Sequence, residues 1–233
     1  MKIEGSVALV TGANRGLGKA LVAALLEAGA SKVYAAARDE KQITAGVPLR
    51  LDTTKHDQIA AAAEQARDVT LLINNAGVLN SYDALTAPLA HIEADYRTNV
   101  LGTLEVIRAF VPALERARGG GIVNVLSISA LAPVPMMAGY CSSKAASYSL
   151  TQSLRPALRA KQIEIHAALP GIIDTDMVKH VPMDKASPAH VAREILAGLA
   201  RGDEDIFPDP MAQQLSAVWA QGPKHLERAL AAT

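Results

Sequence analysis

The chain has 233 residues, half of them hydrophobic but only 3% aromatic, so its core must be built from aliphatic side chains. Lysine plus arginine and aspartate plus glutamate balance at 23 each, so no global field attracts nucleic acid or a membrane surface, and neither is an expected partner. A single cysteine excludes an internal disulfide framework, and no apolar stretch approaches the roughly 20 residues that span a bilayer, so a cytoplasmic protein is expected.

Short β-branched runs alternate with longer segments of helical period along the chain, which predicts successive strand–helix–strand units. Strands are expected at residues 6–11, 32–37, 48–52, 70–75, 122–128, 163–169 and 205–209. Helices are expected near residues 17–29, 55–67, 90–117, 139–160 and 188–201. The predicted fold is α/β: one Rossmann-like, doubly wound domain over residues 1–233, with a seven-stranded, mostly parallel sheet and helices on both faces.

Two segments depart from this alternation. Residues 172–186 are irregular and follow the sixth strand, beyond whose carboxyl end ligands bind in doubly wound sheets, so they form a candidate substrate lid or else a passive loop. Residues 211–233 form a predicted helical tail, broken at Gly222 and Pro223.

A glycine-rich turn, TGANRGLG, lies between the first strand and the first helix. Gly12, Gly16 and Gly18 let the backbone turn sharply and let a pyrophosphate approach the helix N-terminus, where free N–H groups favour anions. Three glycines alone would also fit a structural loop. Their place between a strand and a helix favours a dinucleotide site.

The stretch YCSSK places Tyr140 and Lys144 four residues apart, on one helix face. That spacing also fits an ordinary helix surface. If the two side chains act together, the Lys144 ammonium lowers the pKa of the Tyr140 phenol and makes it a usable acid. Cys141 points elsewhere on the helix and is expected to be inert packing, and Ser142 and Ser143 are expected to be helix-start residues.

These segments resemble the short-chain dehydrogenase/reductase family. TGANRGLG looks like its cofactor-binding signature, and further matches follow in the family's order: NNAG at 74–77, TNV at 98–100, IVNVLSIS at 122–129, YCSSK at 140–144 and PGIIDTDM at 170–177. The resemblance covers residues 5–177 and fades beyond residue 187. It implies a homodimer or homotetramer, although the tail departs from the family's usual glycine-rich ending, which puts a standard tetramer in doubt.

The resemblance implies a catalytic set of Asn99, Ser127, Tyr140 and Lys144. Tyr140 would donate a proton, Ser127 would bind the carbonyl oxygen, and Lys144 would bind the nicotinamide ribose. Asn99 would hold the water through which Lys144 exchanges protons. Ser129 is the alternative to Ser127, which is preferred because it stands thirteen residues before Tyr140, as in the family.

The charge of the side chain that follows the second strand determines whether NADP or NAD is preferred. A guanidinium binds the 2′-phosphate of NADP, whereas a carboxylate repels it. Ala37 stands where NAD-preferring relatives carry an acid, Arg38 follows it, and Arg15 lies within the glycine turn, so NADP(H) is favoured over NAD(H). The residues expected to bind the cofactor are Gly12, Asn14, Arg15, Gly16, Leu17, Gly18, Arg38, Asp52, Asn75, Ala76, Gly77, Tyr140, Lys144, Pro170, Gly171, Ile173 and Thr175.

The expected function is an NADPH-dependent oxidoreductase that reversibly reduces a small or medium-sized apolar ketone or aldehyde to an alcohol by direct hydride transfer. Its expected pocket residues are Leu131, Val134, Met136, Met137, Ile172, Met177 and Val181. No metal is expected, since the histidines and loop aspartates lack metal-ligand spacing. The alternatives are an NAD(P)-binding regulatory protein without turnover and an epimerase or dehydratase that uses the same tyrosine and lysine.

Overall fold

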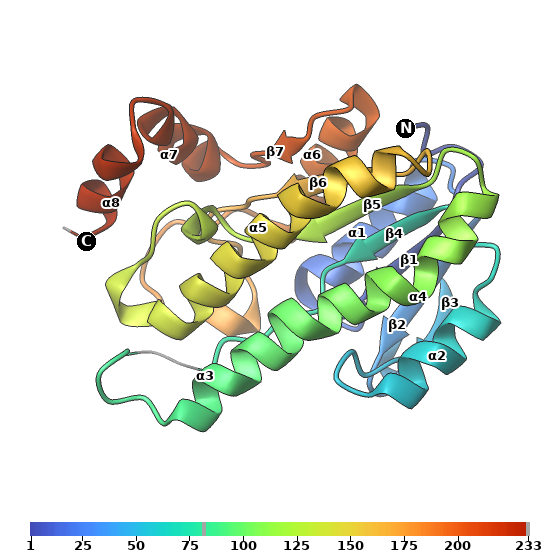
Figure 1. Ribbon diagram of the computed structural model, residues 1–233, viewed down its shortest axis with the longest axis horizontal. Helices are drawn as coiled ribbons and strands as arrows, with labels where there is room; N and C mark the ends of the chain where they lie inside the picture. Colours follow the sequence, from blue (N-terminus) through green and yellow to red (C-terminus); the bar gives the residue numbers. More distant parts are fainter. Residues whose placement is uncertain (81–82, 232–233) are drawn as a thin grey trace.

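The computed structural model describes residues 1–80 and 83–231. Seven parallel strands form one sheet in the order β3-β2-β1-β4-β5-β6-β7 (Figure 1). They are β1 (Val7–Thr11), β2 (Lys32–Ala37), β3 (Val47–Arg50), β4 (Leu71–Asn74), β5 (Gly121–Val125), β6 (Glu164–Ala168) and β7 (Asp205–Ile206). Strand order reverses between β1 and β4, which opens the crevice where doubly wound sheets bind ligands.

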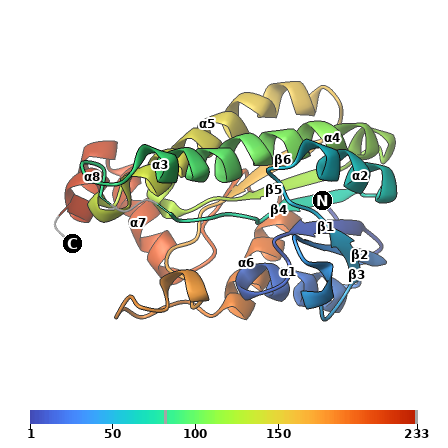
Figure 2. The same cartoon turned by 90° about the horizontal axis from the view of Figure 1, so that it is seen from below.

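Helices cover both faces of the sheet (Figure 2). On one face lie α1 (Gly16–Glu27) and α6 (Pro188–Arg201), and on the other lie α2 (His56–Gln65), α4 (Thr103–Arg116) and α5 (Ala138–Arg159). The predicted α/β, doubly wound fold is therefore confirmed, with a sheet that is parallel throughout.

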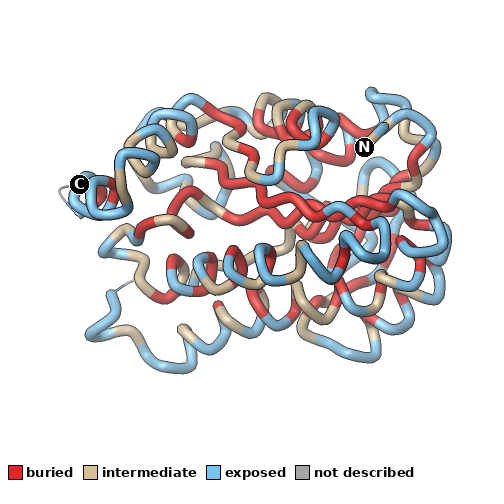
Figure 3. Tube along the Cα trace, turned by 45° about the horizontal axis from the view of Figure 1, so that its top comes forward, coloured by how far each residue is buried: buried red, intermediate tan, exposed pale blue. Residues whose placement is uncertain are grey.

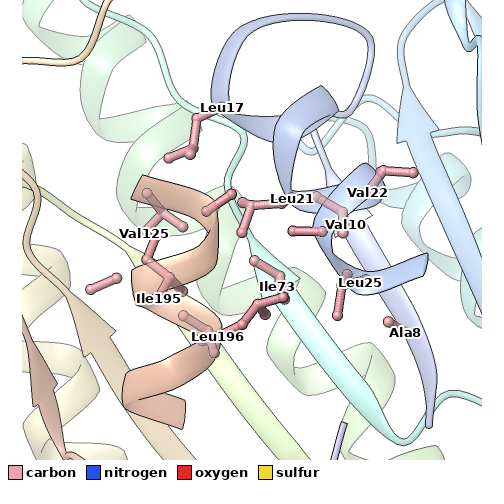
Figure 4. Packing of buried hydrophobic residues seen from close by; sticks show 14 of the residues in the cluster. Ala8, Val10, Leu17, Leu21, Val22, Leu25, Ile73, Val125, Ile195 and Leu196 are labelled. Atoms are coloured by element: carbon pink, nitrogen blue, oxygen red, sulfur yellow. The ribbon is translucent and has the colours of Figure 1, made fainter. Parts of the chain in front are cut away.

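Aliphatic side chains fill the space between α1, α6 and the sheet. Leu17 and Leu21 of α1 and Ile195 of α6 gather over Val10 and Val125 of the strands (Figure 4). Apart from β3, most of which is exposed, the strands are buried along most of their length, whereas the helices expose their outer faces (Figure 3). Burial on both faces explains why the strands are nearly continuous in Val, Ile, Leu and Ala.

The long helix expected at 90–117 is present as an unbroken helical run over residues 89–116, whose middle turn is π-helical. The structure has α3 (Leu89–Tyr96), a π-helical segment (Arg97–Gly102) and then α4. A Cβ on Gly102 would lie 2.6 Å from the carbonyl oxygen of Thr53, so the segment passes close to the loop after β3. The wider π turn contains Asn99, which is consistent with the frequent use of such segments at functional sites.

Two helices follow β7, namely α7 (Pro210–Ala220) and α8 (Pro223–Ala231), and Gly222 between them has a φ of 138°. Leu226 and Leu230 of α8 are buried against Ala132, and Trp219 of α7 packs on the same cluster. The tail therefore covers the segment that follows β5 in its own chain. Within the described ranges, no helix is long and apolar enough to cross a membrane.

Candidate active site

The turn between β1 and α1 is packed so closely that two of its glycines leave no room for a side chain. Gly12 has a φ of 65°, and a Cβ on it would lie 3.0 Å from the Cα of Ala76. A Cβ on Gly18 would lie 2.1 Å from the carbonyl oxygen of Gly12. The result is a backbone cradle at the N-terminus of α1, which fits the pyrophosphate of a dinucleotide.

Thr11 and Asn75 fasten this cradle to the end of β4. The Thr11 hydroxyl accepts the backbone N–H groups of Asn75 at 3.0 Å and Ala76 at 2.9 Å. The Asn75 amide donates to the carbonyl oxygens of Thr11 at 2.9 Å and Gly12 at 3.2 Å. Asn75 was expected to line the groove, and its hydrogen bonds support the turn. Thr11 was not predicted, and its only signal in the sequence is its place directly before Gly12.

The polar side chains at the outer end of the crevice come from three loops. Arg15 is exposed and lies 2.7 Å from Asp176 of the 172–186 segment. Arg38 is exposed directly after β2. Burial opposes the charge of Asp52, but hydrogen bonds from Thr54 and the nearby Arg38 cation hold the pKa of the Asp52 carboxyl below its ordinary value.

Asn14, between Gly12 and Arg15, donates from its side-chain amide to Gln42 Oε1 at 2.7 Å. Gln42 in turn donates to Asp39 at 3.2 Å, and Asp39 is exposed. These bonds link the glycine turn to the loop after β2, which carries Arg38.

Tyr140 lies in the first turn of α5, and the Ser127 side chain is close enough to act on the pKa of its phenol. Ser127 was expected at the end of a strand over 122–128, but β5 ends at Val125, and Ser127 sits two residues beyond it in extended backbone. Ser129 is buried, and its hydroxyl donates to Ser127 Oγ at 2.9 Å. Of the two serines, Ser127 is the one that acts on the pKa of the Tyr140 phenol.

The pKa of Tyr140 moves in the opposite direction to the one expected. Burial raises it above its ordinary value of 10, and the Ser127 side chain lowers it only in part. Lys144 Nζ lies 5.6 Å from the centroid of the Tyr140 ring. The expectation of a phenol made acidic by Lys144 is therefore wrong in this structure: the phenol is neutral and holds its proton.

Lys144 is a buried amine, with 5% of its surface exposed, and Nζ donates to the carbonyl oxygen of Val125 at 3.0 Å. Burial lowers the pKa of Lys144 to about 8, although the carboxylate of Asp95 acts to raise it. Asp95 is fully buried in α3 and accepts the backbone N–H of Asn80 at 2.9 Å. The sequence did not single out Asp95, because its burial depends on the fold around it.

Asn99 joins the π-helical segment to two other elements. Its side chain accepts the N–H of Val78 at 2.9 Å and donates to the Val78 carbonyl at 3.0 Å and to Ser143 Oγ at 2.9 Å. Ser147 donates to the Asn99 carbonyl oxygen at 2.8 Å. Ser143 was expected to be a helix-start residue, but it is buried inside α5 and holds Asn99, which corrects that expectation.

The four predicted catalytic residues come from three elements, since Tyr140 and Lys144 share α5, and two of the four lie beside Gly77. A Cβ on Gly77 would lie 3.3 Å from Asn99 Oδ1 and 3.5 Å from Lys144 Nζ. Gly77 follows β4, so this group faces the same crevice as the glycine turn. The crevice therefore has two parts. One is the backbone cradle of the glycine turn, and the other carries the Tyr140 phenol, the Ser127 hydroxyl and the Lys144 ammonium.

The 172–186 segment lies against the glycine turn and is closed at its base. Ile173 and Ala186 pair through their backbones. Thr175 packs on the turn, since a Cβ on Gly16 would lie 3.1 Å from Thr175 Cγ2. Between these fixed points the segment is mostly exposed.

The residues expected to line a substrate pocket fall into three groups. Met136 and Met177 are 65% and 39% exposed, and Val181 lines a shallow depression with Met183 and other neighbours. Leu131 instead packs in the hydrophobic cluster under the tail. The remaining three, Val134, Met137 and Ile172, are half-buried.

Cys141 is 1% exposed, and burial raises the pKa of its thiol. The Val134 backbone N–H donates to Sγ at 3.4 Å. Both features belong to a packed thiol rather than a reactive one. Across residues 1–80 and 83–231, no three His, Cys, Asp or Glu side chains group as metal ligands would.

Comparison with known proteins identifies the family. A family model described as short chain dehydrogenase matches residues 6–186. The chain is 41% identical to a short chain dehydrogenase from Burkholderia cenocepacia, solved in complex with NADP, over 99% of both chains with a TM-score of 0.94. It is 29% identical to a 3-oxoacyl-acyl-carrier-protein reductase from Thermotoga maritima, over 88% of each chain.

A short chain dehydrogenase/reductase from Burkholderia phymatum, solved in complex with NAD, is 22% identical over 95% of both chains with a TM-score of 0.85 and shares the fold. The matched family and the 41% identical relative solved in complex with NADP support a nicotinamide dinucleotide as the cofactor. They also support cofactor-dependent oxidation and reduction as the reaction class. The chain belongs to the short-chain dehydrogenase/reductase family of oxidoreductases.

Proposed function

We propose that this protein is an NADPH-dependent carbonyl reductase in which Tyr140 donates the proton. The observation that carries the proposal is the position of the buried Lys144 ammonium, whose Nζ lies 5.6 Å from the centroid of the Tyr140 ring, with Ser127 acting on the same phenol. A carbonyl oxygen between the phenol and the serine hydroxyl would meet two donors as negative charge develops on it. When bound, the reduced nicotinamide supplies the hydride.

In the free protein, the protonation states of Tyr140 and Lys144 favour reduction of a carbonyl over oxidation of an alcohol. Tyr140 is held neutral by burial, so it carries the proton that the new alkoxide needs. Lys144, with its pKa at about 8, is mostly charged at about pH 7 and would bind the ribose hydroxyls while stabilising the phenolate that remains. Asn99 would keep Lys144 in reach of solvent by holding a water, as the family resemblance implies.

The cofactor residues proposed from the sequence remain the proposal here. The turn at Gly12 to Gly18 would hold the pyrophosphate, Asp52 the adenine, and Arg15 and Arg38 the 2′-phosphate. The 41% identical relative in complex with NADP supports the choice of NADPH. Because Arg15 lies 2.7 Å from Asp176, a phosphate at this place would compete with that carboxylate for the guanidinium.

Arg38→Ala is expected to raise the KM for NADPH at least about tenfold, because a charge-assisted hydrogen bond to the 2′-phosphate is lost. The KM for NADH should stay within about twofold. Steady-state kinetics with both nucleotides measures the split. Arg228→Ala in α8, an exposed arginine that is not among the proposed cofactor-binding residues, is the control, and equal losses for both nucleotides would contradict the cofactor assignment.

The substrate proposed is a small or medium-sized ketone or aldehyde with an apolar substituent. The side chains at the rim are apolar and adaptable, notably Met136, Met177 and Met183, all exposed. Residues 172–186 are proposed to act as a lid over this side, hinged at the pair Ile173 and Ala186. We also propose that the chain forms a single domain and assembles into a cytoplasmic homodimer or homotetramer. Light scattering would measure the mass of this assembly and so the number of its subunits.

The proposed function is tested by following NADPH oxidation against a panel of aldehydes and ketones, with the alcohol product identified. Consumption of NADPH with matching alcohol formation is the expected result. Tight NADPH binding without turnover on any carbonyl would instead support a nucleotide-binding regulatory protein. Conversion of a sugar nucleotide without net nicotinamide oxidation would support an epimerase.

A further inference from the structure

Asp209 is a buried carboxylate that the proposed mechanism does not use. It lies between β7 and α7 with 1% of its surface exposed. Oδ1 accepts the backbone N–H of Ala212 at 2.9 Å, and Oδ2 accepts the backbone N–H of Gly171 at 2.8 Å. The first bond caps α7. The second bond reaches back 38 residues to Gly171, which lies in the strip of chain that directly follows β6.

That second bond fixes one peptide plane. The carbonyl of Pro170 and the N–H of Gly171 belong to the same planar peptide group. The carbonyl accepts the backbone N–H of Ile128 at 2.8 Å, and the N–H donates to Asp209. The group is therefore held from both sides. Because Ile128 directly follows Ser127, this one peptide plane fixes the strip after β6 relative to the serine proposed to bind the carbonyl oxygen.

The carboxylate is packed directly against this backbone. A Cβ on Gly171 would lie 2.8 Å from Asp209 Oδ1 and 3.0 Å from both Cβ and Sδ of Met211. Asp209 therefore cannot shift without moving either the strip or the first turn of α7. Met211 also borders the shallow depression formed with residues 181–185, so the same turn reaches the proposed lid.

We propose that Asp209 is a positioning residue for the nicotinamide end of the cofactor crevice, an inference that rests on the proposed function. It acts through the Pro170–Gly171 peptide on residues 171–175, whose backbone would meet the nicotinamide carboxamide. Loss of the carboxylate frees this peptide to rotate. The nicotinamide then loses its fixed position relative to Ser127 and Tyr140, while the adenosine half of the crevice stays intact.

The test compares Asp209→Ala with Asp209→Ser. Alanine removes both bonds, whereas serine keeps a hydroxyl that can cap α7 but has only one acceptor atom close to the backbone, so it does not also hold Gly171. Binding is measured by calorimetry for NADPH and for ADP-ribose 2′-phosphate, which lacks the nicotinamide. Thermal unfolding is followed in parallel.

Asp209→Ser should regain most of the Tm lost in Asp209→Ala and bind ADP-ribose 2′-phosphate within about twofold of the wild type. It should bind NADPH about tenfold more weakly and reduce kcat by more than it raises the KM for the carbonyl substrate. A serine variant that binds NADPH as tightly as the wild type, or that loses both ligands equally, would reduce Asp209 to a helix cap and overturn the inference. A wild-type protein that binds neither ligand would instead overturn the proposed function.

Discussion

Tyr140→Phe is expected to lower kcat for carbonyl reduction by about 10²- to 10⁴-fold, the range that a general acid contributes. The ring and its packing remain, but the atom that carries the proton is gone. Calorimetry should give an NADPH Kd within about threefold of the wild type, since the phenol contributes little binding beyond one hydrogen bond. Steady-state kinetics with the best carbonyl from the panel measures the loss.

Tyr148→Phe is the matched control for this variant. Tyr148 is a buried tyrosine two turns further along α5, and its hydroxyl donates to Asp205 at 2.8 Å, away from the crevice. Its loss should cost about 1 kcal/mol of stability and leave kcat near the wild-type value. If Tyr140→Phe turned over as fast as Tyr148→Phe, the phenol of Tyr140 would not be the acid.

Lys144→Met is expected to lower kcat at least about a hundredfold while making the folded protein more stable. The amine is buried, and burial lowers its pKa from 10.5 to about 8, so carrying its charge at about pH 7 costs the fold up to about 3 kcal/mol. Methionine fills a similar volume without that cost. Thermal unfolding and steady-state kinetics on one preparation measure both effects.

The pH dependence of the stability of Lys144→Met provides a second test of the buried ammonium. Between about pH 8 and 10.5 the unfolded chain holds a proton on Lys144 that the folded chain has released, so stability rises with pH across this window. Lys144→Met should lack that rise. Lys161→Met, which removes an exposed lysine paired with Glu115, should keep it. A variant at position 144 that is less stable than the wild type at all pH values would contradict a buried, destabilising ammonium.

The sheet, its helices and the glycine turn are predictable from the sequence because their signals are local. Aliphatic runs mark buried strands, helical period marks the helices, and the break at Gly222 is marked by a glycine and a proline. Ser187 caps α6, accepting the backbone N–H of His190 at 3.2 Å, and a serine followed by a proline is a local signal of a helix start. Each of these depends on residues that are near neighbours in the chain.

The π-helical segment and the supporting polar residues depend instead on contacts between distant parts of the chain. Gly102 passes over Thr53, and Asn99 is held by Val78 and Ser143, and none of these pairs is adjacent in sequence. Thr11 is buried only because the end of β4 lies against it. No periodicity in the sequence carries that information, so the sequence predicted the helix but not its π-helical turn.

The direction of the Tyr140 pKa shows the limit of reasoning from spacing. A four-residue spacing correctly places Tyr140 and Lys144 on one side of α5, with Nζ 5.6 Å from the ring. It does not give the burial of either group, and burial is the largest cause of both shifts. The same is true of Asp209, whose partners come from the strip after β6 and from α7.

The central claim is that a neutral Tyr140 and a charged Lys144 act together on a carbonyl beside bound NADPH. The most direct test is the single-turnover rate of NADPH oxidation after preloaded wild-type enzyme is mixed with a ketone from the panel, across about pH 6 to 10. The rate should be constant up to about pH 7 and fall as Lys144 loses its proton, with an apparent pKa of about 8. A rate that rises through this range, or an enzyme that oxidises no NADPH at any pH, would contradict the account.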